Sequence, residues 1–525
     1  MGLRGSPSRS EGKPMFDMHP DDRPKAFAFV LFGVPLLAWL TVATWIRQHA
    51  DGPRPNLLQL VRDTVHGSAP GLLVVLLAGL VVGVASLLAV DRLGTSSAGG
   101  ASFRKHLRGT RVVTKAALVR ATRERGEEQV TVAGVPMPTS VETFHLLVAG
   151  STGSGKSVAI RELTLSALLR GDRVIVADPN ADMLSRFWQE GDVLLNPHDD
   201  RSVGWSFFNE IRRDFDFKRY ALSLVPRGRT NEEEEWCSYA RLLLCETAKK
   251  LALAGPPSVR ELQRWTTIAQ PNELQQFLVG TPAESLFVGA DKALASARFV
   301  LSSKLPEHVA MPPGAFSLRS WLEDPQGGNL FLTWREDMAE SLRPLISAWI
   351  DALCTSILSL DQANPRRIWM FIDELASLEK LPSLIDAATK GRKAGLRLVA
   401  GIQSTAQLDE IYGREEAQAL RSCFRSLLVL GGAKTDPKTC EELSKALGER
   451  EVERDNYGST RNLKGNSAST YAQRTREPVV LASDIASLPD LTGYLAYAGD
   501  QAIARVRLVY VQFRQRVPPF AERTC

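Results

Sequence analysis

Apolar runs of two lengths divide the chain into a short N-terminal part and a large body. Two long runs, 26–46 and 70–90, contain no charged residue. At about 1.5 Å rise per residue, each run would be about 30 Å long as a helix, which matches the hydrocarbon core of a bilayer. We therefore predict two transmembrane helices over these ranges. Together they form a transmembrane domain over 26–90, with a connecting loop over 47–68.

A signal peptide and a pair of buried core helices are the other interpretations of these runs. The first run is long for a signal peptide, ends in the bulky residues Trp45 and Ile46, and shows no small-residue cleavage site. Core helices of soluble proteins rarely lack charge over such a length. Pro35, inside the first run, is tolerated in a membrane helix. Membrane helices are therefore the favoured interpretation.

Basic residues are much denser after the second run than in the loop between the runs. The loop contains Arg47, Arg54 and Arg62, and the segment after the second run contains Arg92, Arg104, Lys105, Arg108, Arg111, Lys115, Arg120, Arg123 and Arg125. By the positive-inside rule, both termini lie in the cytoplasm and the loop lies outside. Anionic lipid headgroups explain the basic stretch 104–125, and a contact with nucleic acid stays open.

The segment before the first run, 1–25, is predicted to be an N-terminal tail. Its first part, Met1–Pro14, is polar and rich in Gly, Ser and Arg, which is typical of an extension outside the folded protein. We expect the native start at Met15 or Met18. The tail plays no part in the fold prediction.

Shorter apolar runs in the body predict the strands of a buried parallel sheet. These runs are 144–149, 173–177, 367–372, 396–401 and 427–430. Helices are predicted over 158–169 and 381–389, and Asp436 followed by Pro437 begins another helix. Alternation of buried strands with helices is typical of an α/β fold built from βαβ units.

A glycine-rich segment lies between the first of these strands and its helix. It reads Gly150, Ser151, Thr152, Gly153, Ser154, Gly155, Lys156 and Ser157. This is the G-x-x-x-x-G-K-S pattern of a phosphate-binding loop, whose backbone N–H groups turn towards phosphates beside a helix N-terminus. We predict that it binds ATP, with Lys156 at the β- and γ-phosphates and the Ser157 hydroxyl on Mg²⁺.

Two adjacent carboxylates, Asp373 and Glu374, end the apolar strand 367–372. We predict that Asp373 helps to hold Mg²⁺ and that Glu374 polarises the attacking water. A solvated pair at a strand end is less favoured, because the preceding strand is wholly apolar. Asp178 ends another strand, where it serves either as an outer polar residue of the site or as a strand-end cap; both interpretations stay open.

Two further residues complete the predicted catalytic set. Gln403 follows the strand 396–401, where it would sense the γ-phosphate. Arg392 lies in the basic loop 390–395 before that strand. This loop is either an ordinary solvent-facing turn or the source of an arginine finger for a neighbouring subunit.

More than 200 residues separate Ser157 from Asp373, which is far more than a minimal nucleotide-binding domain needs. Helical patterns dominate this interval, beginning with 231–254, whose start is acidic and whose end precedes two prolines. We therefore predict an all-α inserted domain over 205–318. The nucleotide-binding domain comprises 91–204 and 319–525.

The polar segment 457–476 is predicted to be a mobile loop or hairpin. It combines tyrosines with basic residues, a pairing that suits single-stranded nucleic acid. An exposed loop without such a role is the simpler interpretation.

Composition adds few restrictions. The 525 residues carry 64 Lys and Arg against 59 Asp and Glu, and this net charge of +5 neither requires nor excludes a nucleic-acid partner. The six cysteines show no C-x-x-C pair or zinc-binding spacing, which indicates reduced thiols in a cytoplasmic protein.

With these residues in place, the chain resembles the coupling proteins of conjugative type IV secretion, a family of RecA/FtsK-like hexameric ATPases. The resemblance rests on the two membrane runs, the motifs GSTGSGKS at 150–157, IDELASLEKLPSL at 372–384 and GRKAGLRLVAGIQS at 391–404, and the helical insert. It implies a RecA-like P-loop domain and a homo-hexamer around a central channel. It also implies ATP-driven transport of single-stranded DNA with its relaxosome proteins, above all the relaxase, and docking to the secretion channel in the bacterial inner membrane.

Three other functions share part of this pattern. An FtsK-type translocase of double-stranded DNA usually has more spans, a long linker and a winged-helix module, and this sequence shows none of them. An ABC transporter is disfavoured because no LSGGQ-like signature occurs. A membrane-anchored scaffold that uses ATP as an assembly switch stays open, although Lys156, Asp373 and Glu374 together favour turnover.

Overall fold

The computed structural model describes residues 29–49, 55–94, 105–288, 291–363, 365–462, 465–499 and 502–523. The chain forms two compact units, Met1–Phe103 and Arg104–Cys525. The predicted N-terminal tail 1–25 lies outside the described residues.

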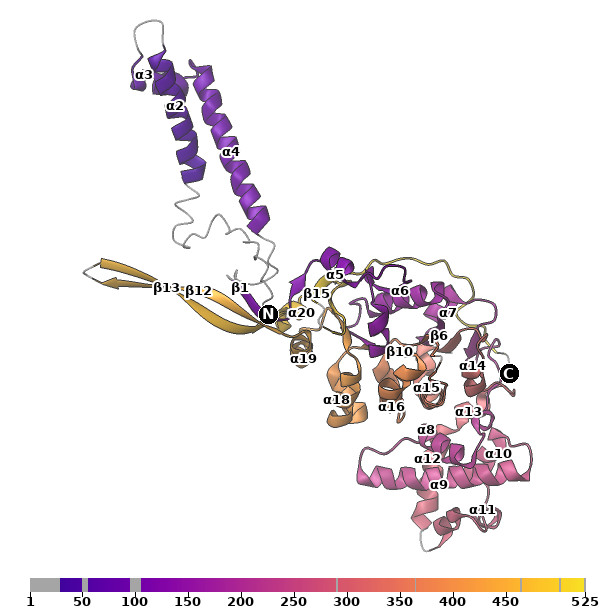
Figure 1. Ribbon diagram of the computed structural model, residues 1–525. Coiled ribbons are helices and arrows are strands. Elements are labelled where there is room, and N and C mark those ends of the chain that lie inside the picture. The colour runs from indigo at the N-terminus through magenta and orange to yellow at the C-terminus, as the bar shows by residue number, and fades with distance from the viewer. Residues whose placement is uncertain are drawn as a thin grey trace, which may run out of the picture. The chain divides into compact units, whose positions relative to one another are not determined.

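The N-terminal unit consists of helices (Figure 1). They are η1 (Phe29–Gly33), α2 (Val34–Gln48), α3 (Leu57–Val65) and α4 (Pro70–Gly94). The described parts of the two long apolar runs are therefore helical, as predicted, whereas the connecting loop contains the additional helix α3. Trp39 Nε1 of α2 donates a hydrogen bond of 3.1 Å to Thr64 Oγ1 of α3. Gly79 lets α4 approach α2 closely, because a Cβ atom there would lie 3.0 Å from Pro35 Cα.

A membrane span is not established by these helices alone. Within the described residues, no single helix combines the length and apolar character needed to cross a bilayer. One pair of helical segments, Leu57–Val65 and Pro70–Ala85, meets both criteria together but is bent by 75°.

The larger unit is built around a sheet with ten strands among the described residues, in the order β2-β15-β14-β11-β5-β10-β9-β6-β8-β7. The strands are β2 (Val112–Val113), β5 (Leu146–Ala149), β6 (Arg173–Pro179), β7 (Val193–Leu195), β8 (Leu330–Trp334), β9 (Ile368–Ile372), β10 (Leu396–Ile402), β11 (Ser426–Leu430), β14 (Thr492–Ala496) and β15 (Ile503–Arg507). From β11 to β7 the neighbours are parallel, whereas β14 is antiparallel to both β11 and β15. All five strands predicted from the apolar runs are present.

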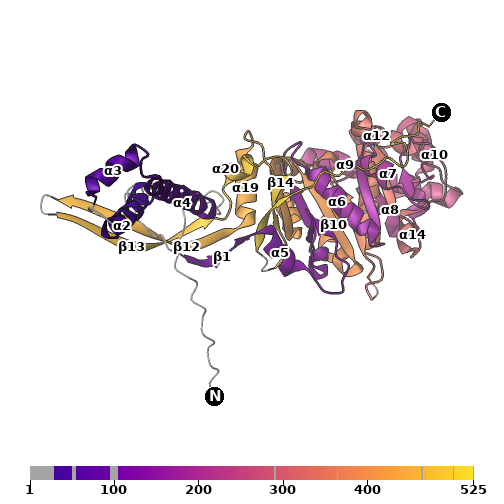
Figure 2. The same ribbon diagram turned by 90° about the horizontal axis from the view of Figure 1, so that it is seen from above.

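Helices cover both faces of this sheet (Figures 1 and 2). On one face, Ile160 and Leu163 of α6 (Lys156–Leu169) share a buried cluster with Phe371 of β9. On the other face, Trp349 of α15 (Ala339–Ile357) shares a cluster with Met370, the neighbouring residue of β9. Because successive side chains of a strand point to opposite faces, a strand buried on both sides is apolar throughout.

The remaining elements of the nucleotide-binding part are short. They are α5 (Lys115–Thr122), β3 (Thr131–Val132), β4 (Val135–Pro136), η2 (Thr139–Phe144), α7 (Asp182–Phe187), α14 (Leu318–Glu323), η6 (Glu336–Met338), η7 (Leu375–Ser377), α16 (Leu384–Lys390), η8 (Gly391–Ala394), α17 (Thr405–Tyr412), α18 (Arg414–Cys423), α19 (Pro437–Leu447) and α20 (Ala482–Ala486). The predicted cap of α19 is present, since the Asp436 side chain accepts a hydrogen bond from Thr439 N.

The described part of the predicted insert consists of helices between β7 and β8. They are η3 (Phe207–Glu210), α8 (Asp214–Leu224), α9 (Asn231–Ala254), α10 (Val259–Gln263), η4 (Arg264–Ile268), α11 (Pro271–Phe277), η5 (Pro282–Phe287), α12 (Asp291–Lys304) and α13 (Pro306–Ala310). Among the described residues of the insert, β-type pairing is limited to one isolated bridge, between Trp205 and Phe316. The two ends of the insert meet beside this bridge, because a Cβ atom on Gly204 would lie 2.1 Å from Pro313 O. The domain boundaries at 205 and 318 stay a prediction.

The polar segment 457–476 belongs to a long hairpin, the second of the two conformations predicted for it. Its strands are β12 (Glu449–Asn462) and β13 (Gly465–Pro478), and β1 (Lys105–Gly109) adds to β12. The hairpin extends away from the main sheet (Figures 1 and 2). At its base, Glu477 forms ion pairs with Arg450, at 2.9 Å, and with Arg454, at 2.6 Å.

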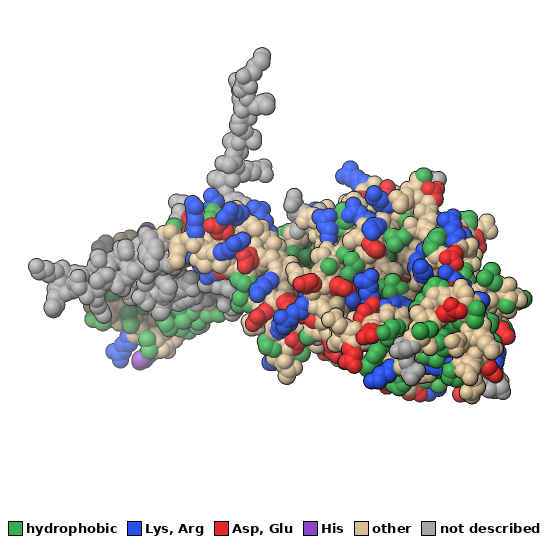
Figure 3. Space-filling view, turned by 90° about the horizontal axis from the view of Figure 1, so that it is seen from below, with side chains coloured by type: hydrophobic (Ala, Val, Ile, Leu, Met, Phe, Trp, Pro, Cys, Tyr) green, Lys and Arg blue, Asp and Glu red, His purple; other side chains and the backbone are tan. Residues whose placement is uncertain are grey.

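Charged side chains of both signs are interspersed on the face of this unit that carries the insert (Figure 3). The described part of this face therefore shows no broad field of one sign. A nucleic-acid contact has to be located from individual contacts and not from net charge.

Candidate nucleotide-binding site

The glycine-rich segment forms a tight loop between β5 and α6. Gly153 and Gly155 have φ angles of +79° and +111°, which side-chain-bearing residues rarely adopt. The loop is fastened to neighbouring strands, since Gly150 N donates to Ile402 O at 3.1 Å and Ser151 N donates to Gly431 O at 2.8 Å. These bonds hold the loop at the carboxyl ends of the parallel strands, where α/β sheets bind ligands.

Lys156 begins α6 and is buried beside the loop. Its ammonium group donates hydrogen bonds to the carbonyl oxygens of Gly150, at 2.9 Å, and Ser151, at 3.3 Å. Burial lowers the pKa of Lys156, and the carboxylates of Glu374 and Asp373 act against that shift. The loop thus holds a cation next to the two acidic residues that follow β9.

Ser157 and Asp373 are joined across the site. Ser157 Oγ donates a hydrogen bond of 2.7 Å to Asp373 Oδ2. Asp373 Oδ1 is buried and has no hydrogen-bond partner among the described residues. Burial raises the pKa of this carboxyl group, and the Ser157 hydroxyl acts against the shift. A hydroxyl beside a carboxylate with an unused oxygen fits Mg²⁺, which prefers oxygen ligands.

Glu374 lies next to Asp373, and both of its carboxylate oxygens are buried without a hydrogen bond of regular geometry among the described residues, although the Gln403 side chain and the Ala376 backbone lie close enough to lower its pKa. Burial raises its pKa, and the Lys156 ammonium is the main opposing influence. A buried carboxylate without a partner is costly unless a ligand uses it. Its position suits a group that accepts a hydrogen bond from a water molecule at the nucleotide.

Gln403 lies beside the phosphate-binding loop. Thr152 Oγ1 donates a hydrogen bond of 3.0 Å to Gln403 Oε1. This placement follows from the strand order, because β10 pairs with β5 on one side and with β9 on the other. The close approach of β10 to the end of β9 requires a glycine, since a Cβ atom on Gly401 would lie 1.9 Å from Asp373 O.

Arg392 is exposed in η8 and precedes the first residue of β10. Gln403 follows the last residue of the same strand. The strand therefore separates Arg392 from the phosphate-binding loop of its own chain. Its guanidinium lies 5.0 Å from the centre of the Phe144 ring, and the Arg425 guanidinium lies 4.3 Å from the same ring. No pattern in the sequence indicates this contact, because Phe144 is one residue of an apolar run and lies at the end of η2, before β5.

The position of Asp178 decides between the two roles left open for it, an outer polar residue of the site and a strand-end cap. The buried carboxylate accepts hydrogen bonds from Met183 N, at 3.0 Å, and Leu184 N, at 2.7 Å. Burial raises its pKa to about 7. Asp178 therefore acts as a strand-end cap on the first turn of α7.

Comparison with known proteins places this site in a family. The family model for the type IV secretion-system coupling protein DNA-binding domain matches residues 129–509. The chain belongs to this family of coupling proteins. A curated relative is the coupling protein TraD of Escherichia coli K12, which is 31% identical over 417 residues, covering 75% of this chain and 56% of TraD. The conjugal transfer protein TraG of Agrobacterium fabrum is 29% identical over 160 residues, covering 30% of this chain and 24% of TraG.

Solved structures of a plasmid coupling protein are similar over nearly the whole described body. The bacterial conjugative coupling protein TrwBdeltaN70, in its unbound form, has 62% identity and a TM-score of 0.78, covering 82% of this chain and 100% of its own. TrwB in complex with ADP and Mg²⁺ has 62% identity and a TM-score of 0.76, covering 81% and 100%. This similarity confirms the predicted RecA-like nucleotide-binding fold of this coupling protein, with a mixed sheet.

Proposed function

We propose that this coupling protein is a DNA-dependent ATPase that drives the transfer of single-stranded DNA in conjugation. The observation that carries the proposal is the convergence of Lys156, Ser157, Asp373, Glu374 and Gln403 at the ends of three adjacent strands. Two of these groups, Asp373 and Glu374, keep buried carboxylate oxygens without a hydrogen bond of regular geometry among the described residues. The complexes of TrwB with ADP and Mg²⁺ and with the ATP analogue ADPNP support ATP and Mg²⁺ as the ligands of this chain.

Each residue has a role in this proposal. The backbone of Gly150–Ser157 binds the phosphates, and Lys156 binds the β- and γ-phosphates. Ser157 and Asp373 would hold Mg²⁺, which would supply charge neutralisation at the phosphates. Glu374 accepts a proton from the attacking water or orients it, and Gln403 reports the presence of the γ-phosphate to the loop through Thr152.

The assembly follows from the family. We infer a homo-hexamer around a channel, in which Arg392 of one subunit reaches the nucleotide of its neighbour. The opposite placement of Arg392 and Gln403 along β10 supports this direction. The partners are single-stranded DNA, the relaxosome with its relaxase, and the inner-membrane components of the type IV secretion channel.

The location is the bacterial inner membrane. The helices over 26–46 and 70–90 cross it, in contact with membrane lipids, and both termini remain in the cytoplasm. The charge asymmetry described above supports this topology.

A measurement of ATP hydrolysis tests the proposal. The full chain, purified in detergent, is assayed with single-stranded DNA, with double-stranded DNA and without DNA. We expect turnover that single-stranded DNA increases, and loss of turnover in Lys156→Thr with the fold retained. Preferential stimulation by double-stranded DNA would favour an FtsK-type translocase. ATP binding without turnover would favour the ATP-switched scaffold.

A further inference from the structure

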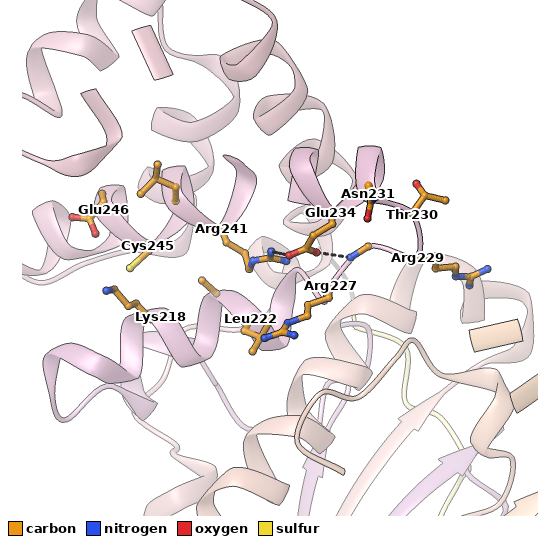
Figure 4. Close-up of a pocket in the computed structure, with 13 residues that line it drawn as sticks. Lys218, Leu222, Arg227, Arg229, Thr230, Asn231, Glu234, Arg241, Cys245 and Glu246 are labelled. Carbon is orange, nitrogen blue, oxygen red and sulfur yellow. Dashed lines mark hydrogen bonds and ion pairs between the residues drawn. The ribbon is translucent and has the colours of Figure 1, made fainter. Parts of the chain in front are cut away.

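The loop between α8 and α9 is held in one conformation by the first turns of α9. Gly228 N donates a hydrogen bond of 2.7 Å to Glu234, and Arg229 N donates one of 2.9 Å to Glu233. The Arg241 guanidinium donates to Val225 O and to Pro226 O, both at 3.1 Å, and also pairs with Glu234. Figure 4 shows Glu234 between Arg241 and the loop backbone, with the Arg229 side chain directed away from both.

The residue between two arginines has to be a glycine. A Cβ atom on Gly228 would lie 2.3 Å from Glu234 N, so the loop could not rest on α9 in this way with a side chain there. The acidic residues at the start of α9 therefore fix the backbone of the sequence Arg227-Gly228-Arg229. Both arginine side chains project from this fixed backbone and are exposed.

Neighbouring carboxylates neutralise little of the charge on these two guanidinium groups. Arg227 has no ion pair among the described residues, and Arg229 lies 3.9 Å from Glu410 with both side chains largely exposed, at 58% and 76%. Exposed pairs of this kind contribute little. Among nearby cations, Lys304 pairs with Glu379 and Lys380 pairs with Glu416 at 2.9 Å, whereas Arg343 is exposed and has no ion pair among the described residues.

Arg227 and Arg229 line a cleft of about 770 Å³ between the insert and the nucleotide-binding part. The wall contributed by the insert includes Phe299, whose ring is 75% exposed. The opposite wall contains 376–380, which follow Glu374 almost directly, and residues of α17, which begins two residues after Gln403. The cleft thus adjoins the segments that leave the nucleotide site.

We propose that Arg227 and Arg229 bind the phosphodiester backbone of single-stranded DNA in this cleft, with a base stacked on Phe299. Guanidinium groups grip phosphate oxygens in pairs, and an exposed aromatic ring beside them suits an unpaired base. This proposal rests on the proposed function and locates the binding site of its substrate, single-stranded DNA, in the cleft. DNA held there contacts both segments that follow Glu374 and Gln403, so a nucleotide-dependent shift of either segment acts directly on the strand.

The test measures the salt dependence of DNA binding by the full chain in detergent, with a fluorescent single-stranded oligonucleotide. Each phosphate contact contributes about 0.7 to the slope of log K against log salt. We expect Arg227→Ala with Arg229→Ala to reduce the slope by about 1.4, and the double lysine variant to retain most of it. Phe299→Ala should lower the affinity about tenfold without changing the slope. A matched control, Arg260→Ala with Lys292→Ala, removes two exposed charges from the insert outside the cleft.

Each outcome decides between assignments. An unchanged slope in the double alanine variant, with thermal unfolding intact, would overturn the assignment while the proposed function stands. If the double alanine variant keeps the slope but no longer binds a poly-glutamate peptide, the cleft binds an acidic protein segment. This outcome also overturns the assignment to DNA. Failure of the unaltered chain to bind single-stranded DNA would overturn both the assignment and the proposed function.

Discussion

Thr152 in the phosphate-binding loop and Gln403 at the end of β10 are joined by a hydrogen bond of 3.0 Å across 251 positions of sequence. If Gln403 senses the γ-phosphate, Gln403→Ala should lower kcat by about 10²-fold. ATP affinity should change little, because the phosphate-binding loop supplies most of the contacts. Steady-state hydrolysis and binding of a fluorescent ATP analogue check the two quantities separately. An unaltered kcat would remove Gln403 from the mechanism.

The two carboxylates after β9 should separate in role. Glu374→Gln should retain nucleotide binding and slow hydrolysis strongly, because the amide cannot accept a proton from water. Asp373→Ala should also weaken affinity for Mg²⁺-nucleotide, since it removes the partner of Ser157. Titrations with and without Mg²⁺ distinguish the two effects. Equal binding defects in both variants would contradict this division.

Arg392 should act on the nucleotide of a neighbouring subunit. Arg392→Ala alone should reduce turnover by about 10³-fold or more, as removal of an arginine finger does. Mixing inactive Lys156→Thr chains with inactive Arg392→Ala chains should restore partial activity, because some interfaces then combine an intact loop with an intact finger. Demonstrated co-assembly without recovery would count against action in trans, and normal activity of Arg392→Ala would end the idea.

Stability should fall on acidification through His145. Its Nδ1 accepts a hydrogen bond from Leu398 N at 3.0 Å while Nε2 lies 2.7 Å from Ala388 O, so the buried ring is held neutral. Burial lowers the pKa of His145 from 6.5 to about 4. Between these values the unfolded chain binds more protons, so this contribution is present above pH 6.5 and is lost as the pH falls towards 4.

The size of this effect is about 3 kcal/mol, at about 1.4 kcal/mol per pKa unit. Thermal unfolding of the full chain between pH 4.5 and 7.5 measures it. His145→Gln should flatten the dependence in part, while buried His308, whose pKa burial lowers to about 3, retains its own share. His66→Gln, at an exposed histidine, should change nothing. A dependence identical in His145→Gln and the unaltered chain would refute the assignment.

The loop between the two apolar helices should be accessible from outside the cell. In a cysteine-free background, Asn56→Cys should react with an impermeant thiol reagent in intact cells. Asn56 caps α3, so Leu58→Cys, at a side chain that is 77% exposed, provides a second site that spares the cap. Lys393→Cys should react only after permeabilisation. The reverse pattern would invert the topology.

The sequence predicted five of the ten strands described in the main sheet, because parallel strands buried on both faces are continuous apolar runs, as in Leu146–Ala149 and Ile368–Ile372. It could not predict which strands are neighbours. The contact between Thr152 and Gln403 depends on β10 lying between β5 and β9, and this order is set by packing across the whole sheet.

Other features had weaker local signals. The hairpin strands Glu449–Asn462 and Gly465–Pro478 are polar on both faces and show no alternation of apolar and polar residues. The stacking of Arg392 and Arg425 on Phe144 joins three residues from separate segments. The stacking cannot be found by reading along the chain, because it arises from contacts between remote segments. The hairpin joins consecutive strands, but without an apolar face the sequence could name it only as one of two conformations for 457–476.

The adjacency of Gly204 and Pro313 makes the helical insert a cassette. The chain leaves and re-enters the nucleotide-binding part at one place, and β7 and β8 remain paired in parallel on either side of it, with Val193 opposite Leu330. An exchange of the residues between these two points would therefore leave the sheet order intact. Chimaeras cut at these two positions would show whether an insert can be exchanged between related chains while the ATP chemistry of the recipient is kept.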